Sequence, residues 1–448
     1  MDVGTAEERE TLIEDAQAVL DRNWTGGSTI PSRSLYPHQW SWDAAFIAVG
    51  RSWHDQQRAE QDLESLLAAQ WTNGMLPHIV FNPAVPPGTY FPGPEFWDSD
   101  RAAGHRRGPA TSGITQPPLH ALAALEVHRR AQHPVRAQAF LERVYPKLVA
   151  QHDYLARWRD PAGHGLAVIV HPWESGMDNA PIWDEDLRLA IPPGVVPPYR
   201  RHDLVHADPG DRPTKTAYDR FVYLAITYRD EGYDDSRLLA TSPFLVEDPL
   251  FNAIWCASAH ALAEIATLLG RDPAPQRELA GRISAGMRQH LWDPETRRFH
   301  ARDVRPDKLL RHNMITSLMP LLDPDLPADF VDAIIADLCS EHFRPAVPGA
   351  FLVPSHDLVS PEFDRRRYWR GPVWINTDWL LWRGLNQHGT AAGASAIAAE
   401  IAASMVRLVR LSGWREYFDP FTGAGYGSAD FSWSAALVLD LLCRLGTG

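Results

Sequence analysis

The strongest constraint on the fold is an apolar spacing of three and four residues that recurs along almost the whole chain. Because an α-helix turns once every ~3.6 residues, this spacing places the apolar side chains on one helix face. Alternating apolar and polar residues, which would mark strands, do not extend over any useful length. The pattern predicts helices over 6–23, 42–54, 57–71, 117–133, 136–158, 216–230, 250–270, 274–292, 311–323, 328–340, 374–387, 391–411 and 432–445.

The predicted helices follow one another in pairs, without the fixed repeat period that marks a solenoid. A closed ring of six inner and six outer helices, the (α/α)6 barrel, accommodates about a dozen antiparallel helices in one unit. A chain of 448 residues is long enough to bury such a core. We therefore predict an all-α fold in which residues 1–448 form a single (α/α)6 domain.

Two long segments, 72–115 and 184–215, interrupt the helical pattern and carry many of the 37 prolines. Segments of this length without regular structure in a compact domain are usually functional lids or binding loops. We predict that both are lid loops inserted between the helices.

Charge and composition exclude several classes of protein. The net charge of −13 argues against a nucleic-acid partner. No apolar run approaches the ~20 residues of a membrane span, and the first 20 positions resemble an acidic amphipathic helix instead of a signal peptide. Cys256, Cys339 and Cys443 each lie in an apolar helical context, as expected of buried reduced thiols. We predict a cytoplasmic protein without membrane association; its oligomeric state stays open, a homo-oligomer included.

Four motifs place aromatic or proline residues together with polar side chains at the start of an apolar helix. They are YPHQWSWDAAF at 36–46, GITQPPLHALA at 113–123, YWRGPVWINTDWLL at 368–381 and DFSWSAALVL at 430–439. If alternate helices line the inside of a barrel, these helix N-termini converge at one end. As an alternative, these residues could be helix caps and core tryptophans. That explanation fits any one motif better than it fits all four together.

Converging motifs of this kind predict a sugar pocket walled by Trp40, Trp42, Trp374 and Trp433. The CH faces of a sugar pack on aromatic rings, and its hydroxyls need polar partners. Cleavage of a glycosidic bond also needs an acid that protonates the leaving oxygen.

The stretch HPWESGMDNAPIWD, residues 171–184, sets Asp178 among tryptophan, methionine, glycine and proline residues. Such surroundings raise the pKa of a carboxyl group, so Asp178 is the candidate acid, with Glu174 as the alternative in the same loop. A second carboxylate is required across the scissile bond. GWREYFDPFTGAGYGSADFSW, residues 413–433, supplies Glu416; we disfavour its neighbour Asp419, because DPFTG favours a turn in which Asp bonds its own backbone.

WESGMDNAPIWD, YPHQWSWDAAF, YWRGPVWINTDWLL and REYFDPFTGAGYGSADFSWSAALV together resemble glycoside hydrolase family 63, from about residue 30 to the C-terminus. Without an extra β-domain, the chain most resembles the bacterial hydrolases of glucosylglycerate and mannosylglycerate. The resemblance implies an (α/α)6 barrel and an inverting mechanism, with Asp178 as general acid and Glu416 as the base that activates water. The carboxyl groups of an inverting pair lie roughly 6.5–9.5 Å apart.

The resemblance also implies a site for a substrate whose glycerate end carries a carboxylate. Glucosylglycerate is the first expected substrate, and mannosylglycerate the close alternative, because glucose and mannose differ only at C2. Arg212 and Tyr218 match the lid residues that bind glycerate, and Tyr90 is a further candidate on that side. The expected sugar-binding residues are Tyr36, Gln39, Trp42, Asp43, Gln116, Gly176, Trp374 and Asn376, with Tyr368 and Trp369 either in the wall or in ordinary packing.

Neither a metal nor a cofactor is expected. His202 and His206 lie in proline-rich sequence and lack the HExxH pattern, and GAGYG at 423–427 follows no predicted strand and lacks the GxGxxG spacing. Two other classes stay open. A sugar epimerase would share the barrel but needs two catalytic histidines, and the pocket motifs offer only His38. A binding protein would keep the pocket without the chemistry.

Overall fold

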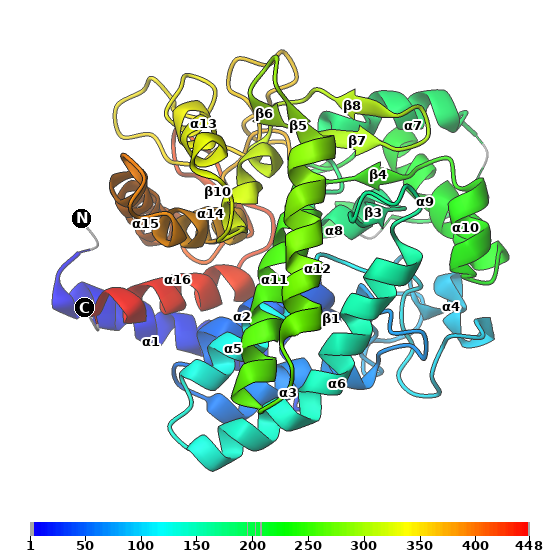
Figure 1. The fold of residues 1–448 in the computed structure, drawn as a ribbon, viewed down its shortest axis with the longest axis horizontal. Helices are drawn as coiled ribbons and strands as arrows, with labels where there is room; N and C mark the ends of the chain where they lie inside the picture. The colour runs from blue at the N-terminus through cyan, green and yellow to red at the C-terminus, as the bar shows by residue number, and fades with distance from the viewer. Residues whose placement is uncertain (1–3, 195, 202, 207, 447–448) are drawn as a thin grey trace.

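The computed structural model describes residues 4–194, 196–201, 203–206 and 208–446, and it is predominantly helical (Figure 1). In this part of the chain, helices are either too short or too polar to cross a membrane. The longer helices are α1 (Ala6–Arg22), α2 (Ser41–Arg51), α3 (Gln56–Ala68), α5 (His120–Arg129), α6 (Pro134–Trp158), α9 (Lys215–Asp230), α11 (Pro249–Leu268), α12 (Ala274–Gly286), α13 (Ala328–Leu338), α14 (Ile375–Gln387), α15 (Ala394–Ser412) and α16 (Ser432–Gly446).

Short elements connect these helices. The short helical turns are α4 (Pro94–Trp97), η1 (Ser99–Arg101), η2 (Pro172–Ser175), η3 (Pro181–Trp183), α7 (Asp184–Ala190), α8 (Asp203–His206), η4 (Pro209–Asp211), α10 (Asp235–Thr241), η5 (Met287–Leu291) and η6 (Ile315–Leu322). The strands are β1 (Gln39–Trp40), β2 (Ile79–Val80), β3 (Val168–Ile169), β4 (Val246–Glu247), β5 (Trp292–Asp293), β6 (Arg298–Phe299), β7 (Ala301–Asp303), β8 (Lys308–Leu310), β9 (Tyr417–Phe418) and β10 (Gly425–Tyr426).

The core helices pack in a chain of contacts that returns to its starting point. α2 packs against α5, α5 against α11, α11 against η6, η6 against α14, α14 against α16, and α16 against α2. A second set covers them from outside: α1 lies on α16, α3 on α2, α6 on α5, α12 on α11, α13 on η6 and α15 on α14.

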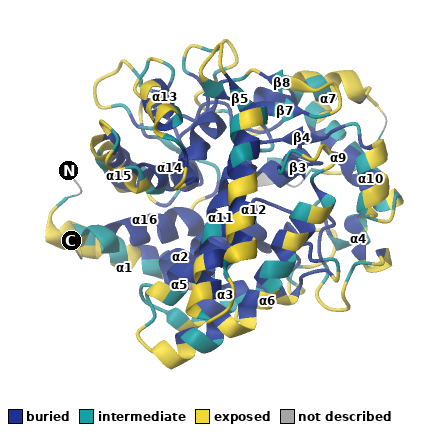
Figure 2. Cartoon of the chain, in the orientation of Figure 1, coloured by how far each residue is buried: buried dark blue, intermediate teal, exposed yellow. Residues whose placement is uncertain are grey.

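Burial follows the composition of the two sets. Every residue of α2 is buried, and its small residues allow close packing: a Cβ atom at Gly50 would lie 2.1 Å from the carbonyl oxygen of Ala436 on α16. Outer helices such as α6 and α12 are amphipathic and bury one face. Figure 2 shows α2 and α16 in the colour of buried residues, whereas α6 and α12 carry exposed positions.

A network of buried charges joins three core helices. Asp440 on α16 is fully buried and accepts hydrogen bonds from the indole nitrogens of Trp53 and Trp379 at 2.8 and 2.9 Å. Arg130, at the end of α5, lies 2.6 Å from Asp440 and 2.9 Å from the buried Glu126. These bonds compensate for the cost of burying the two carboxylates.

Short antiparallel pairings hold the loops at one end of the helices. β3 and β4 belong to a sheet in the order β3-β4-β7-β8, and β3 leads directly into the loop of Asp178. β9 pairs with β10 and begins immediately after Glu416, and β1 pairs with β2 immediately before α2. These strands have two or three residues each, too few for alternation to reveal them in the sequence.

Most of the predicted helices are confirmed. Two helices, the two predicted loops and two of the cysteines differ from the prediction. The predicted helix 311–323 is wrong at its start and in type, since only 315–322 is helical and forms a 3-10 helix that contains Pro320. The helix predicted over 274–292 ends at Gly286 and continues as a π-turn. The predicted loops are not structureless, because α4 lies in the first and α7 and α8 in the second. Cys256 is buried, but Cys339 at the end of α13 is exposed and Cys443 is partly exposed.

Substitution of Asp440 by Asn should lower the free energy of unfolding by about 3–5 kcal/mol, because it leaves Arg130 without its full counter-charge in a buried position. Asp430→Asn is the matched control, since its ion pair with Arg22 has side chains 55% and 53% exposed and is worth ~0–1 kcal/mol. Denaturant unfolding of both variants measures the difference. Equal losses in the two variants would contradict the role given to the buried network.

Candidate functional site

A cavity of about 200 Å³ lies at the end of the core helices where the loops of Asp178 and Glu416 are found. The carboxyl groups of both residues line it. The four sequence motifs do converge, since residues from each of them and from both lid loops form its wall. Of the residues predicted from the sequence, the lining includes Tyr36, Trp40, Trp42, Asp43, Tyr90, Gln116, Gly176, Asp178, Arg212, Tyr218, Tyr368, Glu416 and Trp433.

The loop of Asp178 is fixed by its neighbour Glu174. The Arg159 guanidinium donates to both oxygens of the Glu174 carboxylate, at 2.8 and 2.9 Å, and the pair is fully buried. The backbone N–H groups of Thr115 and Val170 donate to the same carboxylate at 3.1 and 2.8 Å. Glu174, the alternative acid, therefore has a structural ion pair, and Asp178 is left as the carboxyl group of this loop that faces the cavity.

Asp178 has surroundings that favour its protonated form. Loss of hydration in the cavity raises the pKa of Asp178 to about 7, and the carboxylates of Asp203 and Glu416 act in the same direction. Arg212 acts in the opposite direction without overcoming the loss of hydration. The Trp183 indole donates to the backbone oxygen of Asp178 at 2.9 Å, which fixes the backbone that carries the acid.

Glu416 has the opposite environment, because several donors converge on it. Its carboxylate is 1% exposed and accepts from the Tyr36 hydroxyl at 2.7 Å, from Arg212 Nη2 at 3.2 Å and from the Ser428 backbone N–H at 2.9 Å. Three donors from different parts of the chain thus fix the position of this carboxylate. Gly427 makes the geometry possible: its φ is +66°, and a Cβ atom there would lie 2.2 Å from Glu416 Oε2.

Asp419, the competing carboxylate, has the predicted turn role. Its side chain accepts from the backbone N–H groups of Phe421 and Thr422 at 2.8 and 3.0 Å. It is buried and is not among the cavity-lining residues.

Arg212 brings a cation from the second lid loop into the cavity. The side chain is 4% exposed, its guanidinium lies over the Tyr368 ring at 4.6 Å from the centroid, and Nη1 donates to the Tyr36 hydroxyl at 2.9 Å. Its Nε is buried and has no hydrogen-bond partner in the described structure.

The lid loops are held by contacts with each other and with the loop before α14. The rings of Phe91 and Tyr199, one from each lid loop, stack with centroids 4.9 Å apart. Arg370 pairs with Asp184 at 2.5 Å, and Arg366 lies 3.4 Å from Asp211, the residue before Arg212. An ion pair between the second lid loop and the loop before α14 therefore lies directly beside Arg212 in the chain.

Another part of the cavity wall is formed by the N-terminal turn of α2 and its neighbours. The Trp42 backbone N–H donates to Gln116 Oε1 at 3.2 Å, and the Trp42 ring meets Trp433 edge-on at 5.6 Å. Gly176 lies against this ring, since a Cβ atom there would be 2.5 Å from it. Burial raises the pKa of Asp43 well above its usual range, and the Glu416 charge adds to the shift.

Four predicted sugar-binding residues are not among the described residues that line the cavity. Gln39 donates to the Asp62 carbonyl oxygen at 2.8 Å, away from the cavity. The Trp369 and Trp374 rings stack at 3.7 Å behind Tyr368, and Trp374 donates to the Tyr368 carbonyl oxygen at 3.1 Å. Asn376 is fully buried in the first turn of α14.

Sequence reasoning missed several lining residues. Asp203, in the lid helix α8, pairs with Arg201 at 2.5 Å, and Trp173 follows the histidine of the WESGMD loop. The motif position of Trp173 could have indicated it, whereas Asp203 lies in a segment without periodicity. His78 is the histidine among the described lining residues, not His38, and burial lowers the pKa of His78 to about 3. The described lining thus offers no pair of acid–base histidines for an epimerase. His202, dismissed as a metal ligand, lies outside the described residues.

Comparison with known proteins identifies the family. The model of the mannosylglycerate hydrolase MGH1-like glycoside hydrolase domain matches residues 36–434. The chain belongs to this family. It is a glycoside hydrolase, as the sequence motifs predicted.

Relatives of this glycoside hydrolase cover almost its whole length. The mannosylglycerate hydrolase of Rubrobacter radiotolerans is 41% identical over 97% of each chain. The glucosylglycerate hydrolase of Mycolicibacterium hassiacum is 38% identical over 96% of this chain and 97% of its own. The crystal structure of the family 63 mannosylglycerate hydrolase of Thermus thermophilus with Tris and D-glycerate has a TM-score of 0.88, 39% identity, and coverage of 96% of this chain and 99% of that one.

Gly427→Ala should lower the turnover of this glycoside hydrolase by roughly 100-fold, the effect of displacing a catalytic group by about 1 Å. The added methyl group would overlap Glu416 Oε2. Gly270→Ala is the control, because Gly270 has the same φ of +66° with no atom within 4 Å of a Cβ. Steady-state kinetics on the two folded variants tests the claim, and wild-type turnover in Gly427→Ala would contradict it.

Proposed function

We propose that the protein hydrolyses an α-hexoside of glycerate, with glucosylglycerate as the first substrate and mannosylglycerate as the alternative, by inversion at the anomeric carbon. The observation that carries the proposal is a cavity in which a carboxyl group with a raised pKa, a carboxylate held by three donors and a buried arginine meet. The substrates named for the relatives support the glycerate glycosides.

The fold in this proposal is one (α/α)6 domain with two lid loops. The contact sequence from α2 through α5, α11, η6 and α14 to α16 supports an inner ring, and the covering helices support an outer ring. In such a barrel the N-termini of the inner helices meet at one end, which accounts for the position of the cavity-lining motifs.

In the reaction, Asp178 would donate its proton to the glycosidic oxygen as the bond to the anomeric carbon breaks, and glycerate would leave as the alcohol. Glu416 would accept a proton from a water molecule whose oxygen attacks the opposite face of the sugar. The products are a hexose of inverted anomeric configuration and glycerate, and the two carboxyl groups end with exchanged protonation states. This pairing requires the roughly 6.5–9.5 Å separation of an inverting pair.

Arg212, Tyr218 and Tyr90 would form the glycerate side of the cavity. The place of Arg212 in the cavity wall supports this assignment, since a carboxylate accepts charge-assisted hydrogen bonds from a guanidinium. Trp42, Asp43, Gln116 and Trp433 would hold the sugar, with Gly176 giving room for the Trp42 ring. Gln39, Trp369, Trp374 and Asn376 would support this wall from behind instead of touching the sugar.

Release of free hexose tests the function directly. The purified protein is incubated in parallel with glucosylglycerate, mannosylglycerate and trehalose, with Asp178→Asn as the control. We expect hexose from a glycerate glycoside, little from trehalose, and loss of release in the variant. Hexose from trehalose alone would overturn the glycerate assignment and leave the hydrolase intact.

The two carboxyl groups should respond differently to a substrate that needs no acid. Asp178→Asn and Glu416→Gln should each slow hydrolysis of the glycerate glycoside by roughly 10²–10⁴-fold. With the corresponding α-glycosyl fluoride, whose leaving group needs no protonation, Asp178→Asn should recover most of its rate and Glu416→Gln should not. The reverse pattern of recovery would exchange the two roles.

The rate should fall on the alkaline side because Asp178 must carry its proton. With its pKa raised to about 7, kcat/KM for the glycerate glycoside is expected to decline as the pH rises through that value. Hydrolysis of the α-glycosyl fluoride is the internal control, since it should not show this decline. A profile that stays flat to pH 9 with the glycerate glycoside would contradict the assignment.

A further inference from the structure

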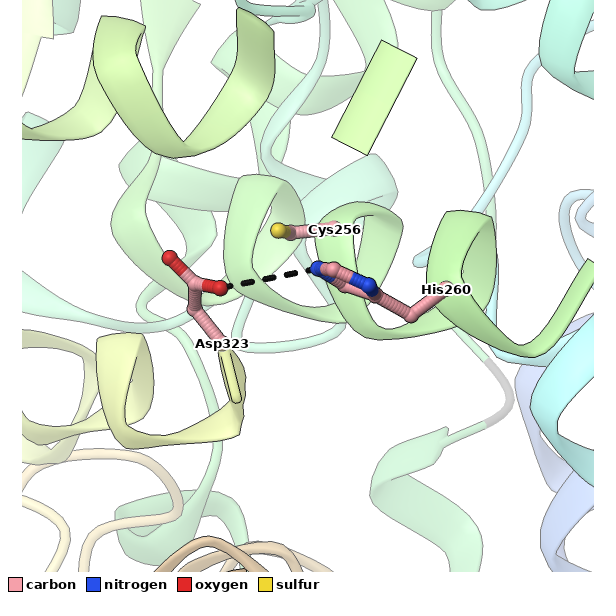
Figure 3. Close-up of side chains that lie close together, drawn as sticks. All are labelled: Cys256, His260 and Asp323. Atoms are coloured by element: carbon pink, nitrogen blue, oxygen red, sulfur yellow. Dashed lines mark ion pairs between the residues drawn. The ribbon is translucent and has the colours of Figure 1, made fainter. Parts of the chain in front are cut away.

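A second cluster of reactive side chains lies between α11, α12 and η6, and none of its members lines the cavity described above. Cys256 and His260 are one helical turn apart on α11, and Asp323 follows the end of η6. Figure 3 shows both α11 side chains directed toward the Asp323 carboxylate. One ligand atom from each of the three lies within 4.8 Å of the others.

His260 has no hydrogen bond of ordinary length to the aspartates of this cluster. His260 Nε2 lies 3.6 Å from Asp323 Oδ1 and 3.8 Å from Asp325 Oδ2, beyond ordinary hydrogen-bond length. The same nitrogen is buried and has no hydrogen-bond partner in the described structure. Distances of this size are close to those between neighbouring ligands around a tetrahedral ion with bonds of about 2.0–2.3 Å.

The cluster has both an interior and an opening to solvent. Cys256 is fully buried, the His260 side chain is 24% exposed, and Asp325 is 76% exposed. The Ser284 hydroxyl on α12 donates to Asp323 Oδ2 at 2.5 Å, which fixes the orientation of that carboxylate. An ion can therefore enter past Asp325 and reach a thiol, an imidazole and an oriented carboxylate.

We propose that Cys256, His260 and Asp323 bind a thiophilic divalent metal ion, with Zn²⁺ as the best match and Asp325 as the fourth ligand. One thiolate, one imidazole and two carboxylates suit the tetrahedral geometry and ligand preference of zinc. On binding, the thiol of Cys256 loses its proton to solvent as the sulfur–metal bond forms, and no redox change takes place. No metal was expected from the sequence, and this cluster brings together Cys256 and Asp323, which lie 67 residues apart along the chain.

The ion would join two core elements that already pack together. Cys256 and His260 belong to α11, and the aspartates belong to the turn that ends η6. An ion that binds only the folded state stabilises it, and the gain grows with the logarithm of the ion concentration above the dissociation constant. The role is thus structural, and it is independent of the glycosidase reaction.

Cobalt(II) titration of the metal-free protein tests the site, because a bound thiolate gives cobalt a charge-transfer band that carboxylates and imidazole do not. We expect the band to saturate at one equivalent and to disappear when Zn²⁺ is added. Cys256→Ser should abolish the band. Cys339→Ser, which alters an exposed cysteine elsewhere, is the matched control and should leave it unchanged.

Affinity and thermal stability complete the test. His260→Ala, at a partly exposed position that tolerates substitution, should weaken Co²⁺ binding by more than the ~10–100-fold that loss of an outer-shell partner costs. Zn²⁺ should raise the thermal midpoint of the wild type and of Cys339→Ser, and should not raise that of His260→Ala. A missing thiolate band, a band that survives in Cys256→Ser, or unchanged affinity in His260→Ala would each overturn the proposal.

Discussion

The active site depends on the different surroundings of two carboxyl groups that line one cavity, and local contacts supply that difference. The Asp178 carboxyl is dominated by loss of hydration, which raises its pKa to about 7. The Glu416 carboxylate is surrounded by a hydroxyl, a guanidinium and a backbone N–H group, all of which donate hydrogen bonds to it.

The structure places these surroundings through features that lie next to each carboxyl group in the chain. The buried Arg159–Glu174 pair fixes the loop that carries Asp178, so the more prominent acid of the motif has a structural role. The β9–β10 pairing fixes the backbone on one side of Glu416, and Gly427 leaves space for its carboxylate. Arg212 links the two halves of the site, because it comes from a lid loop and still contacts Glu416.

The sequence predicted the helices and most of the cavity because both depend on local patterns. Apolar residues spaced with a period of ~3.6 residues mark a helix wherever it lies in the fold. Motifs at helix N-termini meet when those helices pack in parallel. The failures have local causes as well. Gln39 and Trp40 form a two-residue strand, so their side chains point to opposite faces, and only Trp40 reaches the cavity. Trp374 looked like a pocket wall but stacks on Trp369, and contacts of this kind depend on residues that only the fold brings together.

The stereochemistry of the first product tests the proposed inverting mechanism most directly. Proton NMR during hydrolysis of an α-glycoside of glycerate distinguishes the anomers of the released hexose before they equilibrate. Inversion predicts the β-anomer as the first product, since Glu416 would activate water on the face opposite the departing glycerate. The α-anomer as first product would mean that Glu416 attacks the sugar itself, and it would contradict the inverting arrangement of the two carboxyl groups.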